Sequence, residues 1–260
     1  MVLQVVSGED TQVAGCSVRT RLVYLCSAKF YSVSGQPDVL MEDNHLLVVN
    51  KPAGWLVQGD STGDRTLADW CKDYIGRKYN KPGAVFLGVV HRIDRPVSGV
   101  VVFARTSKAL ARMNEIFRQR SLKKIYVALV EGQAPAQKQL IHWLKKNESA
   151  NRANIFREET EGASRCELSF RKITSASGLS LLEVMPVTGR PHQIRAQLSA
   201  IGLPIVGDLK YGASSPNSDR SICLHAHRLE FVHPVSRQLV VLSAPLPRLD
   251  IWQPFRADVT

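Results

Sequence analysis

Short runs of apolar, β-branched residues along the chain predict strands, and turn-forming residues close them. Residues 46–49 (LLVV) form one such run, which Pro52 and Gly54 end in a turn. Residues 100–104 (VVVFA) are apolar throughout, which is typical of a strand buried on both faces. Residues 123–132 (KKIYVALVEG) predict a further strand that ends at a glycine.

Apolar residues at helical spacing predict three helices. The first follows Thr66, which has Asp69 three residues later, the pattern of a capping box. The second begins at Ser107 and has apolar residues along one face. The third covers residues 190–202, with Pro191 in its first turn and a glycine at its end.

The remaining patterns define the fold class. Residues 166–173 and 179–187 alternate as a strand pair around a turn, and residues 222–247 predict two strands joined near Pro234. Residues 135–162 are polar and predict a surface excursion or a hairpin. Strands and helices are interspersed along the chain, but they do not follow a regular βαβ repeat. We therefore expect an α+β fold with a mixed, largely antiparallel central sheet flanked by helices.

The chain divides into two unequal parts. Residues 1–38 show weak alternation and are expected to form an N-terminal extension that adds edge strands or is partly disordered. Residues 39–260 carry the strong patterns and are expected to form one domain.

Charge suggests a partner for this fold. The chain has 34 Lys and Arg against 23 Asp and Glu, a net charge of +11, which favours a polyanion such as nucleic acid. Its five cysteines form no C-x-x-C pair, which argues against a disulfide framework and a cysteine zinc site. No apolar run reaches the roughly 18–20 residues of a membrane span, and no secretory signal opens the chain. We therefore expect a cytoplasmic protein with no membrane partner.

The stretch VVHRIDRPVSGVVVFARTSKAL, residues 89–110, places Asp94 between Arg92 and Arg95. Cationic neighbours keep a carboxylate ionised, and the apolar run behind it predicts a partly dry site. Such a carboxylate can act as a nucleophile or a general base. The alternative is an Asp–Arg pair in a turn that contains Pro96 and Gly99.

Tyr126 follows Lys123 and Lys124 in a predicted strand. An aromatic ring beside lysines can stack on a nucleic-acid base while the lysines hold phosphate. The alternative is a tyrosine in the core of a strand.

The stretch TGRPHQIRAQL forms the start of the third predicted helix. His192, Arg195 and Ser199 share one polar side of it, while the other side is apolar. Arg190 and the backbone N–H groups at the helix start could receive a phosphate. The alternative, especially for His192 and Gln193, is a solvated helix face.

The sequence gives little support for a metal or a cofactor. His225 and His227 lie in an alternating strand, but no carboxylate or thiol completes a recognisable set of ligands. There is no G-x-G-x-x-G or P-loop motif for a nucleotide cofactor.

Taken in order, HRIDRPVSG (residues 91–99), KKIY (123–126) and TGRPHQIR (188–195) resemble the RluA-type pseudouridine synthases. The flanking stretches LLVVNKPAG and LHAHRLEFVHP resemble that family as well. The resemblance makes residues 39–260 a catalytic domain with the pseudouridine synthase fold. The first 38 residues are too few for the S4-type RNA-binding domain of many members, so this chain resembles the short form. Two departures are Ile93, where leucine is usual, and Gln58, where histidine is frequent.

The resemblance implies that uridine in RNA is isomerised to pseudouridine without a metal or a cofactor. Asp94 matches the catalytic aspartate, and Tyr126 matches a tyrosine that stacks on the target base. Arg195 matches an arginine paired with that aspartate. Leu224 matches an apolar residue of the pocket, and Arg92 would lie beside the flipped nucleotide.

Holding a flipped uridine requires many contacts to RNA, because its extrusion from a stem costs a few kcal/mol. The expected substrate-binding residues are Arg92, Leu224, Lys123, Lys124, Arg190, His192 and Gln193. The expected substrate is ribosomal or transfer RNA, and the expected state is a monomer.

The resemblance also predicts a direct ion pair between Arg195 and Asp94, in which the planar guanidinium holds both carboxylate oxygens. Two other functions stay open. One is an RNA-binding protein on the same fold that lacks catalysis. The other is a glycoside-type hydrolase, which requires a second catalytic carboxylate, and the sequence reveals no partner for Asp94.

Overall fold

The computed structural model describes residues 23–24, 35–60 and 63–259. Most of the predicted N-terminal extension, residues 1–38, therefore lies outside the described residues. The helices are α1 (Leu67–Lys78), α2 (Ser107–Arg118) and α3 (Gln193–Ser199), with 3₁₀ segments η1 (Leu209–Tyr211) and η2 (Asp250–Asp258). The strands are β1 (Val23–Tyr24), β2 (Asp38–Glu42), β3 (Leu46–Lys51), β4 (Gly88–Val89), β5 (Ser98–Ala104), β6 (Leu122–Glu131), β7 (Gln137–Asn147), β8 (Arg152–Phe156), β9 (Ser164–Ala176), β10 (Leu179–Pro186), β11 (Leu224–Val232) and β12 (Leu239–Ser243).

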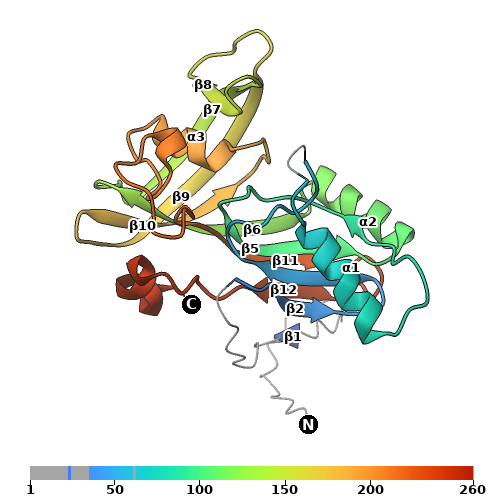
Figure 1. Ribbon diagram of the computed structural model, residues 1–260. Helices are drawn as coiled ribbons and strands as arrows, with labels where there is room; N and C mark the ends of the chain where they lie inside the picture. Colours follow the sequence, from blue (N-terminus) through green and yellow to red (C-terminus); the bar gives the residue numbers. More distant parts are fainter. Residues whose placement is uncertain (1–22, 25–34, 61–62, 260) are drawn as a thin grey trace, which may run out of the picture.

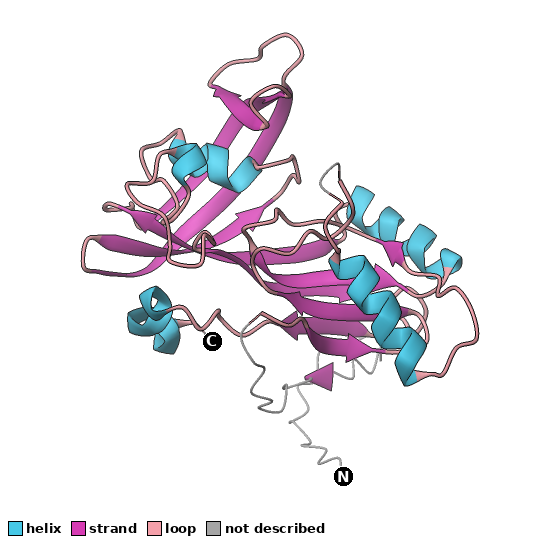
Figure 2. Cartoon of the chain, in the orientation of Figure 1, coloured by secondary structure: helices cyan, strands magenta, loops and turns pink. Residues whose placement is uncertain are grey.

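These strands form one sheet with the central order β2-β3-β5-β11-β6-β10-β9-β7-β8. Among the described strands, only β1 with β12 and β5 with β11 pair in parallel, and the other pairs are antiparallel. The α+β class with a mixed, largely antiparallel sheet is thereby confirmed. Figure 1 shows α1 and α2 beside one half of the sheet and α3 beside the other half, and Figure 2 shows how few helices accompany the strands.

Strands β3 and β5 are buried on both faces, as their apolar runs predict. Leu47 and Val101 belong to one apolar cluster, which includes Cys71 of α1. Leu46 and Val100 belong to a second cluster, which includes Met113 of α2. Because neighbouring residues of a strand point to opposite faces, α1 and α2 cover opposite sides of this half of the sheet.

One glycine makes the centre of the sheet possible. Gly99 pairs with Ala226 where β5 meets β11 in parallel. Its φ is +118°, and a Cβ at this position would lie 2.3 Å from the carbonyl oxygen of Ala226. Only glycine therefore allows the strand that follows Asp94 to join β11.

The other half of the sheet carries α3. The polar region 135–162 forms a hairpin of β7 and β8, so the hairpin alternative was the correct one. A third apolar cluster lies there and includes Leu144 of β7, Ala153 of β8 and Ala196 of α3. The α3 helix thus packs on this hairpin.

The start of α1 agrees with the sequence prediction, and the start of α3 does not. Thr66 caps α1 through a capping box with Asp69, as expected. The third helix is shorter than the predicted range of residues 190–202, because His192 at its N-cap has a φ of +56°. A residue in this left-handed conformation ends helical geometry, so Pro191 lies before the helix and not in its first turn.

No helix in the described part of the chain has the length and apolar character required to cross a membrane.

Candidate active site

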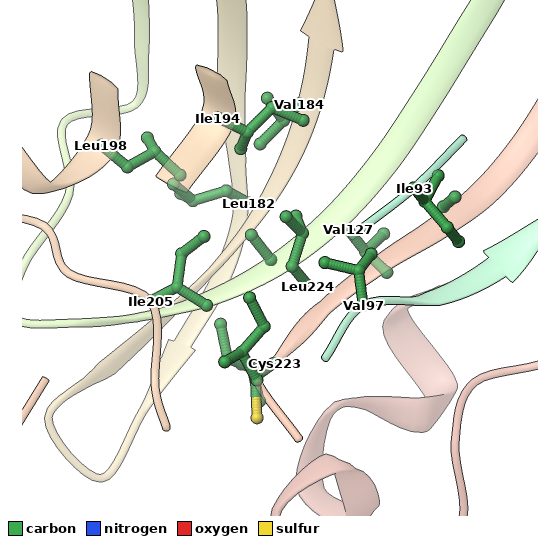
Figure 3. Packing of buried hydrophobic residues seen from close by; sticks show 14 of the residues in the cluster. Ile93, Val97, Val127, Leu182, Val184, Ile194, Leu198, Ile205, Cys223 and Leu224 are labelled. Atoms are coloured by element: carbon green, nitrogen blue, oxygen red, sulfur yellow. The ribbon is translucent and has the colours of Figure 1, made fainter. Parts of the chain in front are cut away.

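Asp94 lies in a turn between β4 and β5, and its side chain is 26% exposed. The turn is closed by a hydrogen bond from the Val97 amide to the Asp94 carbonyl, at 3.1 Å. Ile93 and Val97 on either side of Asp94 are buried in the main apolar cluster, together with Leu224 (Figure 3). This apolar support fixes the backbone of the turn and leaves the carboxylate facing outward.

The two arginines next to Asp94 in sequence do not pair with it. Arg95 donates from Nε to the Gly54 carbonyl at 3.0 Å and forms an ion pair with Asp64 at 2.8 Å. Arg92 is exposed and forms no ion pair with any residue that the structure describes. The interpretation of this stretch as an Asp–Arg pair within one turn is therefore wrong.

The cation that holds Asp94 comes from α3. Arg195 is buried, and its Nη1 donates to Asp94 Oδ2 at 2.9 Å. Its Nε and Nη2 donate to the two carboxylate oxygens of Asp208, at 2.7 and 2.8 Å. The predicted ion pair is thus present, but the expected two-pronged contact is made with Asp208 and not with Asp94.

Asp208 keeps the charge of Arg195 in place. Burial would lower the pKa of Arg195, but hydrogen bonds and charge from Asp208 and Asp94 outweigh it and raise that pKa above its usual value. Asp208 itself is 1% exposed and uses both oxygens on Arg195. Because it is buried and both of its oxygens are bound by Arg195, it is not available as the second catalytic carboxylate that a hydrolase requires.

Tyr126 lies on β6, opposite Val184 of β10, and is half-buried. Burial raises the pKa of its hydroxyl, and the nearby charge of Asp94 raises it further. The hydroxyl is therefore protonated at neutral pH and lies near the carboxylate. Its ring packs on the edge of the main apolar cluster, so the core alternative describes one part of its environment.

His192 approaches Asp94 from the start of α3. Its Nε2 lies 3.9 Å from Asp94 Oδ2, and its Nδ1 lies 2.9 Å from the Tyr211 hydroxyl. Burial lowers the pKa of His192, although Asp94 acts in the opposite direction. The Tyr211 hydroxyl accepts a hydrogen bond from the Ala153 amide at 2.7 Å, so its own proton is free for His192 Nδ1. When the hydroxyl donates to Nδ1, a neutral His192 carries its N–H on Nε2, the atom that lies 3.9 Å from Asp94 Oδ2.

Gln193 has a different role from the predicted contact with substrate. It is buried, and its Oε1 accepts from Thr188 Oγ1 at 2.7 Å and from the Arg190 amide at 3.0 Å. Its Nε2 donates to the Glu167 carbonyl at 3.0 Å. Since both ends of the amide are used inside the protein, Gln193 holds the loop before α3 in shape.

The four predicted phosphate ligands differ in position. Arg190 is exposed, like Arg92, and has no ion-pair partner among the described residues. Lys123 lies 3.9 Å from Glu230. Lys124 is half-buried, and since alternate residues of a strand share a face, it lies on the same face of β6 as Tyr126. The backbone N–H groups at the start of α3 are partly used by the loop itself, so a phosphate site there is not supported.

Lys51 was missed at sequence level. It is fully buried, and its Nζ donates to the carbonyls of Pro52, Trp55 and Arg95, at 3.0, 2.9 and 3.1 Å. It thereby ties the turn after β3 to the turn that carries Asp94. Burial lowers the pKa of Lys51 to about 7, with the charge of Asp94 opposing that shift.

Asp208 and Tyr211 were missed as well. Both belong to the stretch GDLKYG, residues 207–212, where two glycines frame polar residues at a spacing typical of a tight turn. That pattern marks a turn but does not reveal what the turn contacts.

The two histidines of β11 contact the core. His225 shares a hydrogen bond of 2.8 Å with Ser98, and His227 Nδ1 lies 3.0 Å from the Ala244 carbonyl oxygen. In the described residues no group of three or more His, Cys, Asp or Glu side chains is arranged to hold a metal ion.

Comparison with known proteins identifies this arrangement. Residues 45–200, which contain Asp94, Tyr126 and Arg195, match the RNA pseudouridylate synthase family. The chain belongs to that family. An RNA pseudouridine synthase of Bacillus subtilis, described as uncharacterized, is 34% identical over 218 residues, which cover 82% of this chain and 70% of that protein. Ribosomal large subunit pseudouridine synthase C of Escherichia coli is 31% identical over 250 residues, which cover 92% and 76% of the two chains.

Solved structures agree on the fold. Human RNA pseudouridylate synthase domain containing 4 matches with a TM-score of 0.70 at 23% identity, covering 84% of this chain and 92% of that one. Human RNA pseudouridylate synthase domain containing 1 matches with a TM-score of 0.66 at 26% identity, covering 86% and 90%. The RluA-type resemblance is confirmed, and the chain is an RNA pseudouridine synthase, an isomerase.

Proposed function

We propose that this enzyme isomerises a uridine in structured RNA at Asp94, in a cleft lined by basic residues. The observation that carries the proposal is the Arg195–Asp94 contact of 2.9 Å, with Arg195 anchored on Asp208. An arginine that is itself fixed holds the carboxylate in one orientation and places a positive charge beside it, which favours its role as a nucleophile or general base.

The reaction needs no net change in composition. The bond between N1 of the base and C1′ of the ribose breaks, the base turns, and a bond forms between C5 and C1′. The proton on C5 is lost and N1 gains one, so atoms and charge balance. Asp94 takes part either by attacking C1′ or by removing a ribose proton, and both routes need the ionised carboxylate.

Three neighbouring side chains have supporting roles in this proposal. The ring of Tyr126 stacks on the target base, and its protonated hydroxyl lies near Asp94. Arg195 orients the carboxylate. The Nε2 N–H of His192, 3.9 Å from Asp94, donates to an oxygen of the bound nucleotide. Leu224 supports the apolar floor below them.

RNA is the proposed partner because the two segments that supply Asp94 and Arg195 also carry exposed cations without ion-pair partners among the described residues. Arg92 and Arg190 are exposed and unpaired within the described residues, and the whole chain carries a net charge of +11. Several relatives are named for the large ribosomal subunit, which favours ribosomal over transfer RNA as substrate. A monomer that acts in the cytoplasm stays our expectation.

Replacing Asp94 with asparagine tests the proposal. Asp94→Asn keeps the shape and one oxygen for Arg195 but removes the charge. We expect a folded protein that binds RNA almost normally and forms no pseudouridine in total RNA from cells that lack the gene. Turnover at a substantial fraction of the wild-type rate would refute Asp94 as the catalytic group. Asp73→Asn, which removes an exposed carboxylate paired with Arg65, is the matched control.

A further inference from the structure

Lys124 is a half-buried cation for which the described part of the chain provides no carboxylate. Its ammonium lies beside Gly189, at 3.7 Å from the position that a Cβ on that glycine would take. Burial and the charge of Arg120 lower the pKa of Lys124. A buried ammonium next to a second cation is unfavourable unless an anion joins them.

Arg120 lies just beyond the end of α2, and its φ of +56° turns the chain sharply there. Hydrogen bonds with Gln139 and Arg165 lower the pKa of Glu167, and the positive charge of Arg120 contributes to the same shift. That carboxylate is already held by Arg165 at 2.7 Å and by Gln139 at 2.8 Å. Arg120 forms no ion pair or side-chain hydrogen bond with the described residues. Two cations therefore lie close together, and neither forms an ion pair with a residue that the structure describes.

A cavity of about 250 Å³ lies at these two cations. We call it the Lys124 cavity. Its apolar lining includes Phe117, Met185 and Val187, and its polar lining includes Arg120, Lys124 and Ser169. Lys123 also lines it, but this third cation lies 3.9 Å from Glu230. Val187 is 42% exposed, which leaves an apolar surface open to solvent at the rim. A lining that combines cations with apolar side chains suits a group that joins a phosphate to a flat, less polar body.

The Lys124 cavity borders the active site. Lys124 and Tyr126 share one face of β6, two residues apart, or roughly 7 Å along a strand. Gly189, which lies beside the Lys124 ammonium, belongs to the loop that leads through Arg190 to His192. A chain of nucleotides that places one base at Tyr126 therefore brings its neighbour to the cavity.

We propose that the Lys124 cavity binds the nucleotide next to the target uridine, with its phosphate between Lys124 and Arg120 and its sugar or base on the apolar wall. This inference rests on the proposed function, since it needs an RNA chain that passes through the Asp94 site. It adds a binding subsite that holds the strand while the target uridine is out of the stack. The contacts are to phosphate and to an apolar surface, so they favour position over base sequence.

A pair of charge-removing variants tests the subsite. Arg120→Met with Lys124→Met removes the two cavity cations that have no ion-pair partner among the described residues and keeps most of the length of their side chains. The control is Lys108→Met with Arg118→Met, which removes two cations from exposed positions of α2 that do not line the cavity. The probe is total RNA from cells that lack the gene, with pseudouridine counted at each modified uridine over a series of RNA and salt concentrations.

In the cavity variant we expect KM to rise about 10-fold or more, with kcat close to that of the wild type. The slope of log affinity against log salt should fall by about 1–2, since one or two phosphate contacts are lost. The control should keep the wild-type KM and slope. Equal KM and slope in the cavity variant, the control and the wild type would overturn the proposal.

A second variant tests the same cavity without removing a lysine or arginine. Val187→Glu adds a carboxylate at the exposed rim, where it can pair with the two cations and exclude phosphate. Its control, Val187→Gln, has the same size and no charge. We expect KM to rise in Val187→Glu and to change little in Val187→Gln, and equal KM values in both would overturn the proposal. If the wild type itself forms no pseudouridine in this RNA, the proposed function fails, and the subsite falls with it.

Discussion

Arg195 Nη1 lies 2.9 Å from Asp94 Oδ2 and joins two residues that are 101 positions apart in the sequence. This contact brings the turn before β5 together with the start of α3. Arg195 is not free to follow Asp94, since its other N–H groups bind both oxygens of Asp208. The carboxylate of Asp94 is therefore oriented by an arginine that is itself held in place.

Removal of the central cation should affect both stability and rate. Arg195→Met leaves the buried Asp208 without a partner, and breaking a buried pair costs about 3–5 kcal/mol. Chemical denaturation should show this loss, and pseudouridine formation should fall below detection. Arg195→Lys should recover only part of the stability and the rate, because one ammonium cannot reproduce the three contacts of the guanidinium. Full recovery by lysine would contradict the geometric role.

Asp208 should act only through Arg195. Asp208→Asn keeps the shape but removes the charge that fixes the guanidinium, so we expect kcat to fall by about 10-fold or more while KM for RNA stays near that of the wild type. A rise of KM by about 10-fold with an unchanged kcat would show instead that Asp208 supports RNA binding. The exposed Asp219→Asn is a suitable control for the loss of one carboxylate charge.

Tyr211 should set which nitrogen of His192 carries the proton. Tyr211→Phe removes the hydroxyl that bridges the Ala153 amide and His192 Nδ1, leaving a buried N–H unsatisfied at a cost of about 1–3 kcal/mol. We expect ¹⁵N NMR to show His192 shift from the Nε2–H form towards a mixture with the Nδ1–H form, with a lower kcat. A signal identical to that of the wild type would show that the hydroxyl does not select the tautomer.

Two substitutions at Tyr126 separate the contribution of its ring to RNA binding from that of its hydroxyl. Tyr126→Phe keeps the surface for stacking, so RNA affinity should survive, whereas Tyr126→Ala should weaken binding by about 1–3 kcal/mol. Binding titrations with Asp94→Asn as the background avoid turnover. The same loss of affinity in Phe and Ala would show that the hydroxyl is the binding group.

Lys51 should make stability depend on pH in a defined window. Its pKa is lowered from 10.5 to about 7 in the folded protein, so between these values the unfolded chain holds a proton that the folded chain does not. The free energy of unfolding contributed by this group therefore rises with pH from about 7 to about 10.5. Lys51→Met should lack this rise when its denaturation curves are compared with those of the wild type over that range. Parallel pH profiles of the two proteins would contradict a buried lysine of lowered pKa.

Several features were accessible from local sequence because local interactions produce them. The capping box at Thr66 and Asp69 depends on residues three positions apart, and it forms as predicted. The apolar runs of β3 and β5 depend on burial of both faces of a strand, which any central strand requires. The sequence pattern predicts a start of α3 that is too early, because the side-chain amide of Gln193 holds the preceding loop and His192 turns out of helical geometry.

The sequence by itself determined the α+β class, the ordered motifs that reveal the family, and the residues that could carry charge into a cleft. Alternation, helical period and motif order are properties of the chain, so no coordinates are needed to see them. Only the tertiary structure decided which carboxylates share Arg195, that Gln193 is used inside the protein, and that Lys124 and Arg120 meet at one cavity. These contacts join strands and helices that are distant in sequence, and their geometry depends on how the whole sheet pairs and which side chains it buries.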